Sequence, residues 1–284
     1  MNILITGANG QLGNELKIAA KKFDKHTCFF TTKAIVDITD INQVQDYIKK
    51  NNIDTIINAA AYTNVENAED DYQLANSINH LAVKNLAKIA KANNLSLVHI
   101  STDFVFNGKQ HTAYSEKALT NPINNYGKTK LLGEQAMLAI NPEKSIIIRT
   151  SWLYSTFNSN FVKTILRLGV EKQEANVIDN QFGSPTNAKD LANTLLKIVS
   201  KIKNKDIEIY HYSNQGYCSW YTFAQEIVSY SKSNCLIKPI NSKDYPTKAE
   251  RPNNSLMDTQ KIQKEFNIEI PFWKESLKKT IAKI

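Results

Sequence analysis

Cysteine is scarce in this sequence, and its few copies exclude two classes of site. The three cysteines, Cys28, Cys218 and Cys235, are far apart, so they form neither a disulfide framework nor a metal-binding pattern. The five histidines include no HExxH motif and no close pair, which argues against a metal site built on them. His99 falls inside a predicted strand, and we interpret it as a packed residue rather than a catalytic one.

Long apolar runs are also absent. No run of about eighteen apolar residues occurs, so no segment is expected to cross a bilayer. The amino terminus, MNILITGANG, has no basic region, which argues against a secretion signal. We expect a cytoplasmic globular protein whose 284 residues form one large domain and a smaller partner.

The chain carries an excess of positive charge, with a formal net charge of +8. Nucleic-acid binding is the first function that such an excess suggests. However, the lysines are scattered over predicted helix faces, and no basic patch is interleaved with aromatic residues. We therefore expect no nucleic-acid partner, whereas an anionic, phosphate-bearing substrate would suit the charge.

A glycine turn lies between the first predicted strand, residues 2–6, and a predicted helix over residues 14–23. Glycines in a GxxGxxG pattern let the backbone turn sharply and approach a pyrophosphate, while the helix start presents free N–H groups. Such turns also occur for packing reasons, but the position after a strand and before a helix favours dinucleotide binding. The candidate cofactor residues of the turn are Gly7, Asn9, Gly10, Gln11, Leu12 and Gly13.

The end of the second predicted strand, residues 27–31, bears on the choice of cofactor. The acidic residue that would bind a ribose 2′-hydroxyl is missing there, and the chain reads Thr32-Lys33 instead. Lys33 could bind a 2′-phosphate or be an ordinary loop lysine, so NADPH is favoured and NADH stays open. Asp37 and Ile38 are candidates for contacting the adenine.

Strands and helices alternate through the first half of the chain. Further strands are predicted at 54–58, 95–100 and 146–148, and helices at 41–50, 75–93 and 126–140. This alternation predicts an α/β fold with a Rossmann-type, doubly wound parallel sheet. Ligands of such sheets bind at the carboxyl ends of the strands, where Gly7, Thr102 and the small residues Ala59, Ala60 and Ala61 fall.

The second half of the chain is less regular. We assign residues 1–155 to a dinucleotide-binding domain and 156–284 mainly to a smaller substrate-binding domain. Helices are predicted at 160–168, 189–201 and 220–230, and a strand at 207–212 could return to the large sheet. The remaining tail is expected to form loops and short helices.

Three polar residues form a candidate catalytic set. Thr102 follows the strand predicted at 95–100, and Tyr126 and Lys130 lie one turn apart on a predicted helix. A hydroxyl, a phenol and an ammonium group can together protonate a carbonyl that receives a hydride. Without a cofactor, Tyr126 and Lys130 could be an ordinary solvent-facing pair.

At this point the sequence resembles a known family. The motifs GANGQLG, NAAAYTNVENAE, STDFVFNG, YGKTKLLGE, RTSWLY, QFGSPT, SNQGYCSWY and AERPNNSLMD occur in this order. They resemble the extended short-chain dehydrogenases and, among them, the dTDP-4-dehydrorhamnose reductase family. The resemblance covers essentially the whole chain.

The resemblance implies a reaction and a role for each member of the candidate catalytic set. The substrate would be dTDP-4-dehydro-β-L-rhamnose, whose 4-keto group is reduced by a nicotinamide cofactor to give dTDP-L-rhamnose for cell-surface polysaccharide. Tyr126 would donate a proton to the sugar O4, and Thr102 would hydrogen-bond the same oxygen. We expect Lys130 to hold the nicotinamide ribose and to lower the pKa of Tyr126, together with the oxidised cofactor.

Further contacts follow from the same resemblance. It places the nicotinamide, sugar or nucleotide near Thr63, Val65, Asp103, Trp152, Asn160, Gln181, Phe182 and Arg251. Trp152 resembles an aromatic wall beside the sugar, and core packing is its alternative. A guanidinium such as that of Arg251 can hold a phosphate by two parallel hydrogen bonds. Asn160, Gln181, Phe182 and Arg251 could each be structural instead.

Two departures from the family pattern affect the expectations. Phe104 stands where the family more often has tyrosine, which removes one hydroxyl and leaves the catalytic set intact. Some family members dimerise through a magnesium ion held by glutamates. Glu15 fits one of those positions, but Lys189 stands at another. The sequence therefore leaves magnesium binding, and the choice between monomer and homodimer, open.

Two other functions stay open as well. An epimerase or dehydratase acting on nucleotide sugars would keep the fold and the Tyr126–Lys130 pair, although no glutamate follows Asp103 as dehydratases usually require. A non-catalytic regulatory subunit that binds NADP would keep only the fold. The intact catalytic set argues against that last reading.

Overall fold

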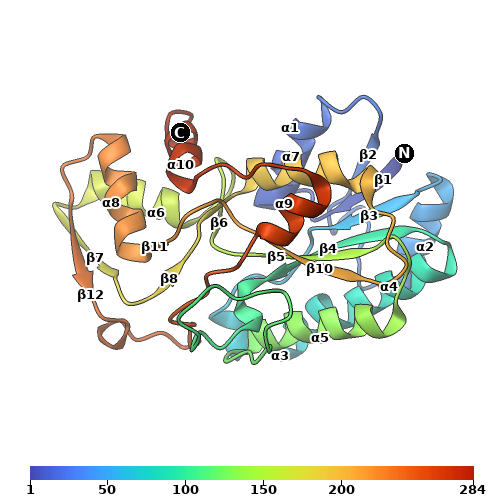
Figure 1. Ribbon diagram of the computed structural model, residues 1–284, viewed down its shortest axis with the longest axis horizontal. Helices are drawn as coiled ribbons and strands as arrows, with labels where there is room; N and C mark the ends of the chain where they lie inside the picture. The colour runs from blue at the N-terminus through green and yellow to red at the C-terminus, as the bar shows by residue number, and fades with distance from the viewer.

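A six-stranded parallel sheet forms the centre of the molecule, and the computed structural model describes all residues 1–284 (Figure 1). Its strands are, in spatial order, β10 (Glu208–Tyr212), β5 (Ile146–Thr150), β4 (Ser96–Thr102), β3 (Thr55–Asn58), β1 (Asn2–Thr6) and β2 (Thr27–Phe30). The predicted Rossmann-type fold is confirmed. The strand order reverses between β1 and β3, and ligands of such sheets bind at the carboxyl ends beside this switch point.

Helices cover both faces of this sheet (Figure 1). Those associated with it are α1 (Gln11–Ala20), α2 (Ile41–Lys50), α3 (Tyr72–Asn76), α4 (Ala82–Ala92), α5 (Asn125–Ile140), α7 (Ala188–Ile198) and α9 (Gln260–Phe266). Because side chains alternate along a strand, Ile3 and Ile5 pack on one face with α1, α7 and α9. Leu4 packs on the other face with α2, α4 and α5. The two cores hold the strand ends in fixed positions.

Short helical turns complete the connections. They are η1 (Asn67–Glu69), η2 (Ser77–Leu81), η3 (Asp103–Val105), η4 (Val199–Lys201) and η5 (Ser242–Asp244). The turn η2 is π-helical and lies between α3 and α4, where the sequence predicts one helix over 75–93. The side chain of Asn79 in η2 accepts a hydrogen bond from Tyr62 N (2.9 Å) and donates one to Tyr62 O (3.0 Å). The turn therefore fixes the loop that follows β3.

Helix α5, which carries Tyr126 and Lys130, has well-defined ends. Its N-cap residue Asn124 accepts a hydrogen bond from Gly127 N (2.8 Å), and Asn141 ends the helix in the left-handed conformation with φ 52°. Both caps are residues that favour these positions. They set the register in which the two catalytic candidates face the strand ends.

The remaining elements form a smaller part of the molecule, on the left in Figure 1. They are β6 (Leu153–Tyr154), β7 (Glu174–Ile178), β8 (Phe182–Gly183), β9 (Thr186–Asn187), β11 (Cys218–Ser219), β12 (Leu236–Ile240), α6 (Phe161–Glu171), α8 (Trp220–Ser231) and α10 (Trp273–Ile281). Strands β7 and β12 pair in parallel, a sheet that the sequence did not predict. One reason is Pro239, which removes a backbone donor from β12 and is a signal against a central strand.

The chain after residue 155 is divided between the two parts. Strand β10 pairs with β5 at the edge of the large sheet, as the predicted strand at 207–212 suggested. Helix α7 packs against α1, and α9 packs on β10, so these helices also belong to the large part. The smaller part therefore contains less of the chain than residues 156–284.

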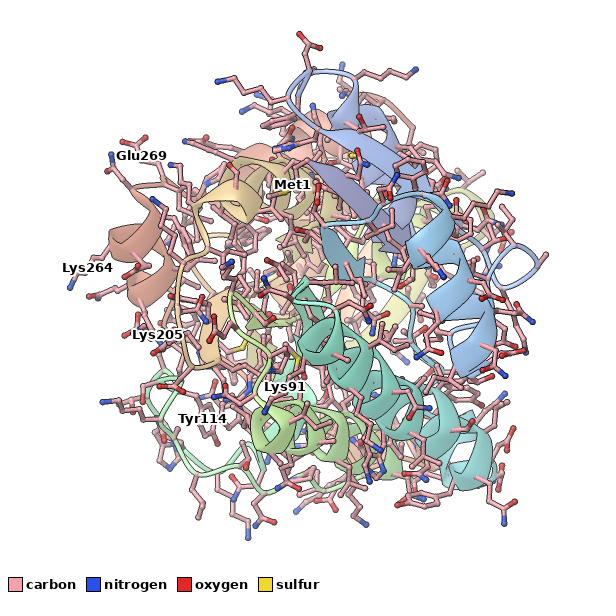
Figure 2. The ribbon with its side chains drawn as sticks, turned by 90° about the vertical axis from the view of Figure 1, so that its right-hand side faces the viewer. Met1, Lys91, Tyr114, Lys205, Lys264 and Glu269 are labelled. Carbon is pink, nitrogen blue, oxygen red and sulfur yellow. The ribbon has the colours of Figure 1, made fainter.

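The surface agrees with the scattered charge of the sequence. Lysines such as Lys205 and Lys264 are exposed on separate elements (Figure 2). No helix combines the length and the apolar character that crossing a membrane would require.

Candidate functional site

A cavity of about 730 Å³ opens at the carboxyl ends of the large sheet and contains most of the predicted site residues. Those that line it are Gly7, Gly10, Gln11, Leu12, Thr32, Lys33, Asp37, Ile38, Ala59, Ala60, Ala61, Thr63, Val65, Thr102, Asp103, Tyr126, Lys130 and Trp152. The predicted residues that do not line it are Asn9, Gly13, Glu15, Asn160, Gln181, Phe182 and Arg251. The cavity thus joins the glycine turn to the catalytic set.

The glycine turn brings the backbone close to the cavity. Gly7 has φ +68°, and a Cβ there would lie 2.7 Å from the backbone of Ala59. A Cβ at Gly13 would lie 2.3 Å from the carbonyl oxygen of Gly7, so both positions require glycine. No side chain caps the N-terminus of α1. Its first N–H groups are therefore available to an anion in the cavity.

Lys33 and Asp37 lie on the cavity wall beyond the turn. Their side chains form an ion pair of 3.7 Å, and the Lys33 side chain is 79% exposed. An exposed ion pair of this kind contributes little stability. The ammonium group is therefore free to bind a second anion such as a phosphate.

Thr102, a member of the candidate catalytic set, lies where β4 ends and η3 begins. Thr102 Oγ1 accepts a hydrogen bond from Phe104 N (3.2 Å) and donates one to Asp103 Oδ1 (3.1 Å). The hydroxyl is thereby held at the cavity wall.

Tyr126 is half-buried and faces the cavity from the first turn of α5, with the ring of Phe104 packed edge-on at 5.6 Å. Burial raises the pKa of Tyr126 to about 12, a hydrogen bond with Thr102 opposes this, and the charge of Asp103 adds to it. The lowering of the Tyr126 pKa that the sequence predicts for Lys130 together with the oxidised cofactor is absent in the chain alone. The physical reason is that burial has the largest effect, while the Lys130 ammonium is directed to other partners.

Lys130 is almost fully buried, with 1% of its surface exposed. Its Nζ donates a hydrogen bond to the carbonyl oxygen of Ile100 (2.6 Å) and contacts His99 Nε2 (3.3 Å). Burial lowers the pKa of Lys130 to about 8, and the charge of Glu134 opposes this effect. Glu134 is itself in a buried ion pair with Arg149 (2.7 Å).

Asp103 is a buried carboxyl group at the cavity wall. Its Oδ2 has no hydrogen-bond partner. Burial raises the pKa of Asp103 to about 6, and neighbouring hydrogen bonds oppose this effect. Asp103 lines the cavity, although its Oδ2 atom is itself buried.

Trp152 forms an aromatic wall of the cavity. Its backbone is in the left-handed region, with φ 47°, which is unusual for a bulky residue. Its ring stacks on Trp220 at 3.5 Å and 9°. A Cβ at Gly183 would lie 2.8 Å from the Trp152 ring, so only glycine leaves room for this orientation. Trp220, within the CSWY motif, was not among the predicted site residues.

The predicted residues outside the cavity lining have other partners. Asn160 is the N-cap of α6 and donates hydrogen bonds to Gln11 Oε1 (3.0 Å) and Ser155 O (2.8 Å). Glu15 is buried and accepts a hydrogen bond from Ser155 Oγ (2.8 Å).

The other members of the predicted nucleotide set lie in the smaller part and its connection. Gln181 is buried, Phe182 is 42% exposed, and Arg251 forms an ion pair with Glu66 in the loop after β3. Glu66 was not predicted as a site residue, although it lies in the motif NAAAYTNVENAE.

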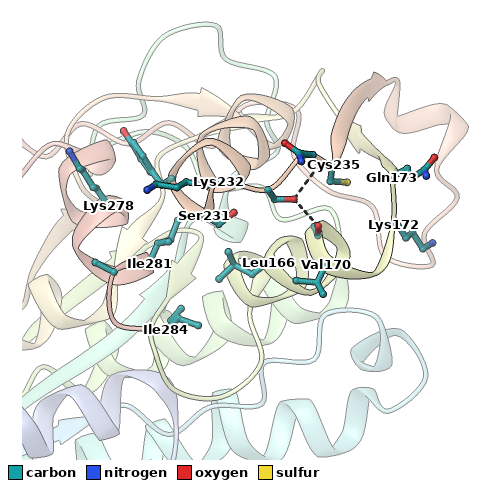
Figure 3. A pocket seen from close by; sticks show the side chains of 15 residues that line it. Leu166, Val170, Lys172, Gln173, Ser231, Lys232, Cys235, Lys278, Ile281 and Ile284 are labelled. Carbon is teal, nitrogen blue, oxygen red and sulfur yellow. Dashed lines mark hydrogen bonds between the residues drawn. The ribbon is translucent and has the colours of Figure 1, made fainter.

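A second cavity of about 1140 Å³ lies at the far side of the smaller part, between α6, α8 and α10 (Figure 3). Lysines and aliphatic side chains such as Lys232, Lys278, Leu166 and Ile281 line it, and none of the predicted site residues does. No group of three or more His, Cys, Asp or Glu side chains is arranged to hold a metal ion.

Comparisons with known proteins agree with the site. The family described as RmlD substrate binding domain matches residues 1–284. The dTDP-4-dehydrorhamnose reductase of Aggregatibacter actinomycetemcomitans is 38% identical over 97% of this chain and 97% of its own length. The enzyme of the same name from Salmonella typhimurium is 35% identical over 100% of this chain and 98% of its own.

Solved structures give the same result. The crystal structure of a dTDP-4-dehydrorhamnose reductase from Clostridium acetobutylicum has a TM-score of 0.93 and 38% identity, covering 99% of each chain. That of a dTDP-4-dehydrorhamnose reductase from Bacillus anthracis, in complex with NADP, has a TM-score of 0.93 and 36% identity, covering 100% of this chain and 99% of its own. The resemblance seen in the motifs is thus confirmed over the whole length, and the chain belongs to the dTDP-4-dehydrorhamnose reductase family.

Proposed function

We propose that this chain reduces the 4-keto group of dTDP-4-dehydro-β-L-rhamnose, with NADPH as the hydride donor, to give dTDP-L-rhamnose. The observation that carries the proposal is the meeting of the glycine turn with Thr102, Tyr126 and Lys130 in one cavity. Membership of a family whose curated members are reductases of this name supports the same reaction.

The residues of the cavity fit a dinucleotide. The turn at Gly7 leaves no room for a side chain, and the uncapped start of α1 offers N–H groups to a pyrophosphate. The exposed ammonium of Lys33 supports a 2′-phosphate and hence NADPH. The relative from Bacillus anthracis was crystallised with NADP, which supports the same choice.

The chemistry divides between the cofactor and the protein. The bound cofactor supplies the hydride that reaches C4 of the sugar. Tyr126, which keeps its proton at neutral pH because its pKa is about 12, donates that proton to O4. Thr102 hydrogen-bonds the same oxygen and orients it. Lys130, one helical turn from Tyr126, would hold the nicotinamide ribose.

The substrate contacts follow the cavity walls. Trp152 would pack against the sugar ring, and the Asp103 carboxyl group, which lines the same cavity, would accept a hydrogen bond from one of the sugar hydroxyl groups. Arg251 would exchange its partner Glu66 for the diphosphate.

The cytoplasmic location and the absence of nucleic-acid and membrane partners stay predictions, as do the oligomeric state and any magnesium requirement.

One assay tests the proposal against its alternatives. The purified chain is mixed with enzymatically prepared keto sugar and NADPH or NADH, and the absorbance of the reduced nicotinamide is followed. A reductase consumes one reduced cofactor per sugar, whereas an epimerase or dehydratase regenerates its cofactor and shows no net consumption. A regulatory subunit binds the cofactor without turnover. Product formation without cofactor consumption would overturn the proposal.

A further inference from the structure

His99 is a fully buried histidine in direct contact with the catalytic lysine. It lies on β4, with 0% of its surface exposed, and its two ring nitrogens have different partners. Nε2 lies 3.3 Å from Lys130 Nζ, and Nδ1 lies 3.1 Å from Asn58 Nδ2. Its burial agrees with the interpretation of His99 as a packed residue, and the two contacts show that it is packed against polar groups.

The contacts continue from Asn58 to the cavity wall. Asn58 Oδ1 accepts a hydrogen bond from Thr6 Oγ1 (2.7 Å), and Thr6 Oγ1 accepts one from Ala60 N (3.3 Å). Ala60 lines the cavity, and Thr6 and Asn58 are buried. A continuous chain of polar groups thus runs beneath the sheet ends from the cofactor side of the cavity to Lys130.

Which ring nitrogen of His99 carries the proton depends on the charge of Lys130. Burial and the charge of Lys130 hold the pKa of His99 well below its ordinary value, so the ring is neutral and carries one N–H. In the arrangement observed, Asn58 donates to Nδ1, so the ring proton is on Nε2 and points to Lys130. Only an uncharged amine, which has a free lone pair, can accept that proton.

The charged form of Lys130 requires the opposite arrangement. An ammonium group has three donors and no acceptor, so it must donate to Nε2 of His99. The ring proton then lies on Nδ1 and needs an acceptor. A half-turn of the Asn58 amide provides one, because it places Oδ1 toward His99 and Nδ2 toward Thr6 Oγ1. This change needs no movement of the backbone, but the Thr6 hydroxyl then accepts from Asn58 and must rotate its own proton away from Asn58.

We propose that His99 is the positioning residue of the catalytic lysine: its Nε2 accepts a hydrogen bond from charged Lys130, and its ring tautomer changes when Lys130 loses its proton. Asn58 turns with it, and Thr6 links the change to the loop at Ala60. His99 touches neither the reacting atoms nor the cofactor, and it acts through Lys130. Only the kinetic test of this role depends on the proposed reduction, because it measures turnover.

Other charged and titratable groups around Lys130 also affect its protonation. Glu134 on α5 favours the ammonium form, and Arg149 on β5 neutralises part of its charge through their ion pair. Tyr126 and Asp103 face the same cavity. None of these groups contacts both His99 and Lys130, so the tautomer of His99 reports the charge of Lys130 specifically.

Nuclear magnetic resonance of the protein labelled with ¹⁵N-histidine tests the tautomer directly. The signals of His99 are assigned by their loss in His99→Gln. With Lys130 titrating at about 8, we expect the Nδ1–H tautomer on the acid side and the Nε2–H tautomer on the alkaline side. In Lys130→Met the pH-dependent change should disappear. One unchanging tautomer in the wild type, or protonation of His99 near its ordinary pKa, would overturn the proposal.

Kinetics provide the second test. His99→Gln places an amide oxygen near the position of Nε2, whereas His99→Leu removes every acceptor. A charge-assisted hydrogen bond is stronger than a neutral one, so losing the acceptor favours the neutral amine. We expect His99→Leu to shift the alkaline limb of the kcat profile to lower pH by about one unit, and His99→Gln to restore it.

The controls separate this role from folding and from the proposed function. His26→Gln changes a histidine whose Nε2 contacts a backbone carbonyl outside the cavity, and it should leave the profile unchanged. NADPH binding shows whether His99→Leu is folded. A folded His99→Leu with an unshifted alkaline limb contradicts the proposal. If the wild type does not reduce the keto sugar, the proposed function fails while the tautomer measurement still decides the role of His99.

Discussion

Arg251 forms an ion pair with Glu66, which joins the connection from the smaller part to the loop that follows β3. The Arg251 side chain is 26% exposed and that of Glu66 38%, and Arg251 also donates to Ala249 O (3.1 Å). Nearby, Lys248 pairs with Asp70. These two ion pairs join the segment around residues 248–251 to the region that follows β3.

Arg251→Ala should raise the KM for the nucleotide sugar by about 10- to 100-fold, because a charged hydrogen-bonding group is lost from the diphosphate. The kcat should change less, since Arg251 lies away from the reacting carbonyl. Glu66→Gln is the matched control, because it breaks the same ion pair and leaves the guanidinium free. Steady-state kinetics with varied keto sugar measure both. An equal rise of KM in the two variants would show that the ion pair, and not phosphate binding, is the important contact.

Tyr126→Phe should lower kcat by about 100-fold or more, because it removes the proton donor and leaves the ring in place. The phenylalanine ring keeps the edge-on packing against Phe104, so the fold and the affinity for NADPH should be preserved. Turnover and NADPH binding by fluorescence are measured on the same sample. An undiminished rate of keto-sugar reduction would remove Tyr126 from the reaction.

Asp103→Asn should make the protein more stable near neutral pH. The pKa of Asp103 is raised by burial from 3.8 to about 6, so folding favours its protonated form. Its favourable contribution is complete below 3.8 and is lost as the pH rises through about 6. A difference of about 2 units corresponds to about 3 kcal/mol, and the amide avoids this cost.

Urea denaturation at about pH 8 and about pH 4 checks the sign of this effect. The free energy of unfolding of Asp103→Asn should exceed that of the wild type by up to about 3 kcal/mol at the higher pH and by much less at the lower. The sugar KM should rise at the same time, because Asp103 lines the cavity. An equal stability difference at both pH values would contradict the raised pKa.

The sequence predicted well those features that depend on local patterns. The glycine turn, the strand end at Thr102 and the spacing of Tyr126 and Lys130 lie within short segments, and the parallel sheet brings them to one edge. The π-helical turn at 77–81 was missed because one additional residue in a turn hardly changes the hydrophobic period.

Contacts between distant segments could not be predicted in the same way. The ion pair of Glu66 with Arg251 and the contact of His99 with Lys130 each join segments that only the folded chain brings together. The raised pKa of Tyr126 in the chain alone was not predicted, because burial depends on packing around the residue, which spacing does not reveal.

Lys33→Ala should weaken the binding of NADPH more than that of NADH, by about 10-fold in the ratio of the two Kd values. The physical reason is that the exposed ammonium of Lys33 can meet the 2′-phosphate, which only NADPH carries. Asp37→Asn breaks the same ion pair and keeps the ammonium group, so it should not lower the affinity for NADPH relative to NADH. Titration of each cofactor by fluorescence gives the Kd values. Equal losses for the two cofactors in Lys33→Ala would place the 2′-phosphate elsewhere.

Gly183→Ala should impair the reaction with the sugar through Trp152. The added methyl group would lie 2.8 Å from the Trp152 ring and 2.9 Å from Ser255 Oγ, so the ring must leave its stack on Trp220. If Trp152 packs against the sugar as proposed, kcat/KM for the keto sugar should fall by about 10-fold or more, with NADPH affinity unchanged. Gly169→Ala is the matched control: its methyl group would also approach a serine Oγ at 2.9 Å, but beside the remote cavity of Figure 3. An equal loss of kcat/KM in both variants would indicate general destabilisation, whereas a loss in Gly183→Ala alone assigns Trp152 to substrate binding.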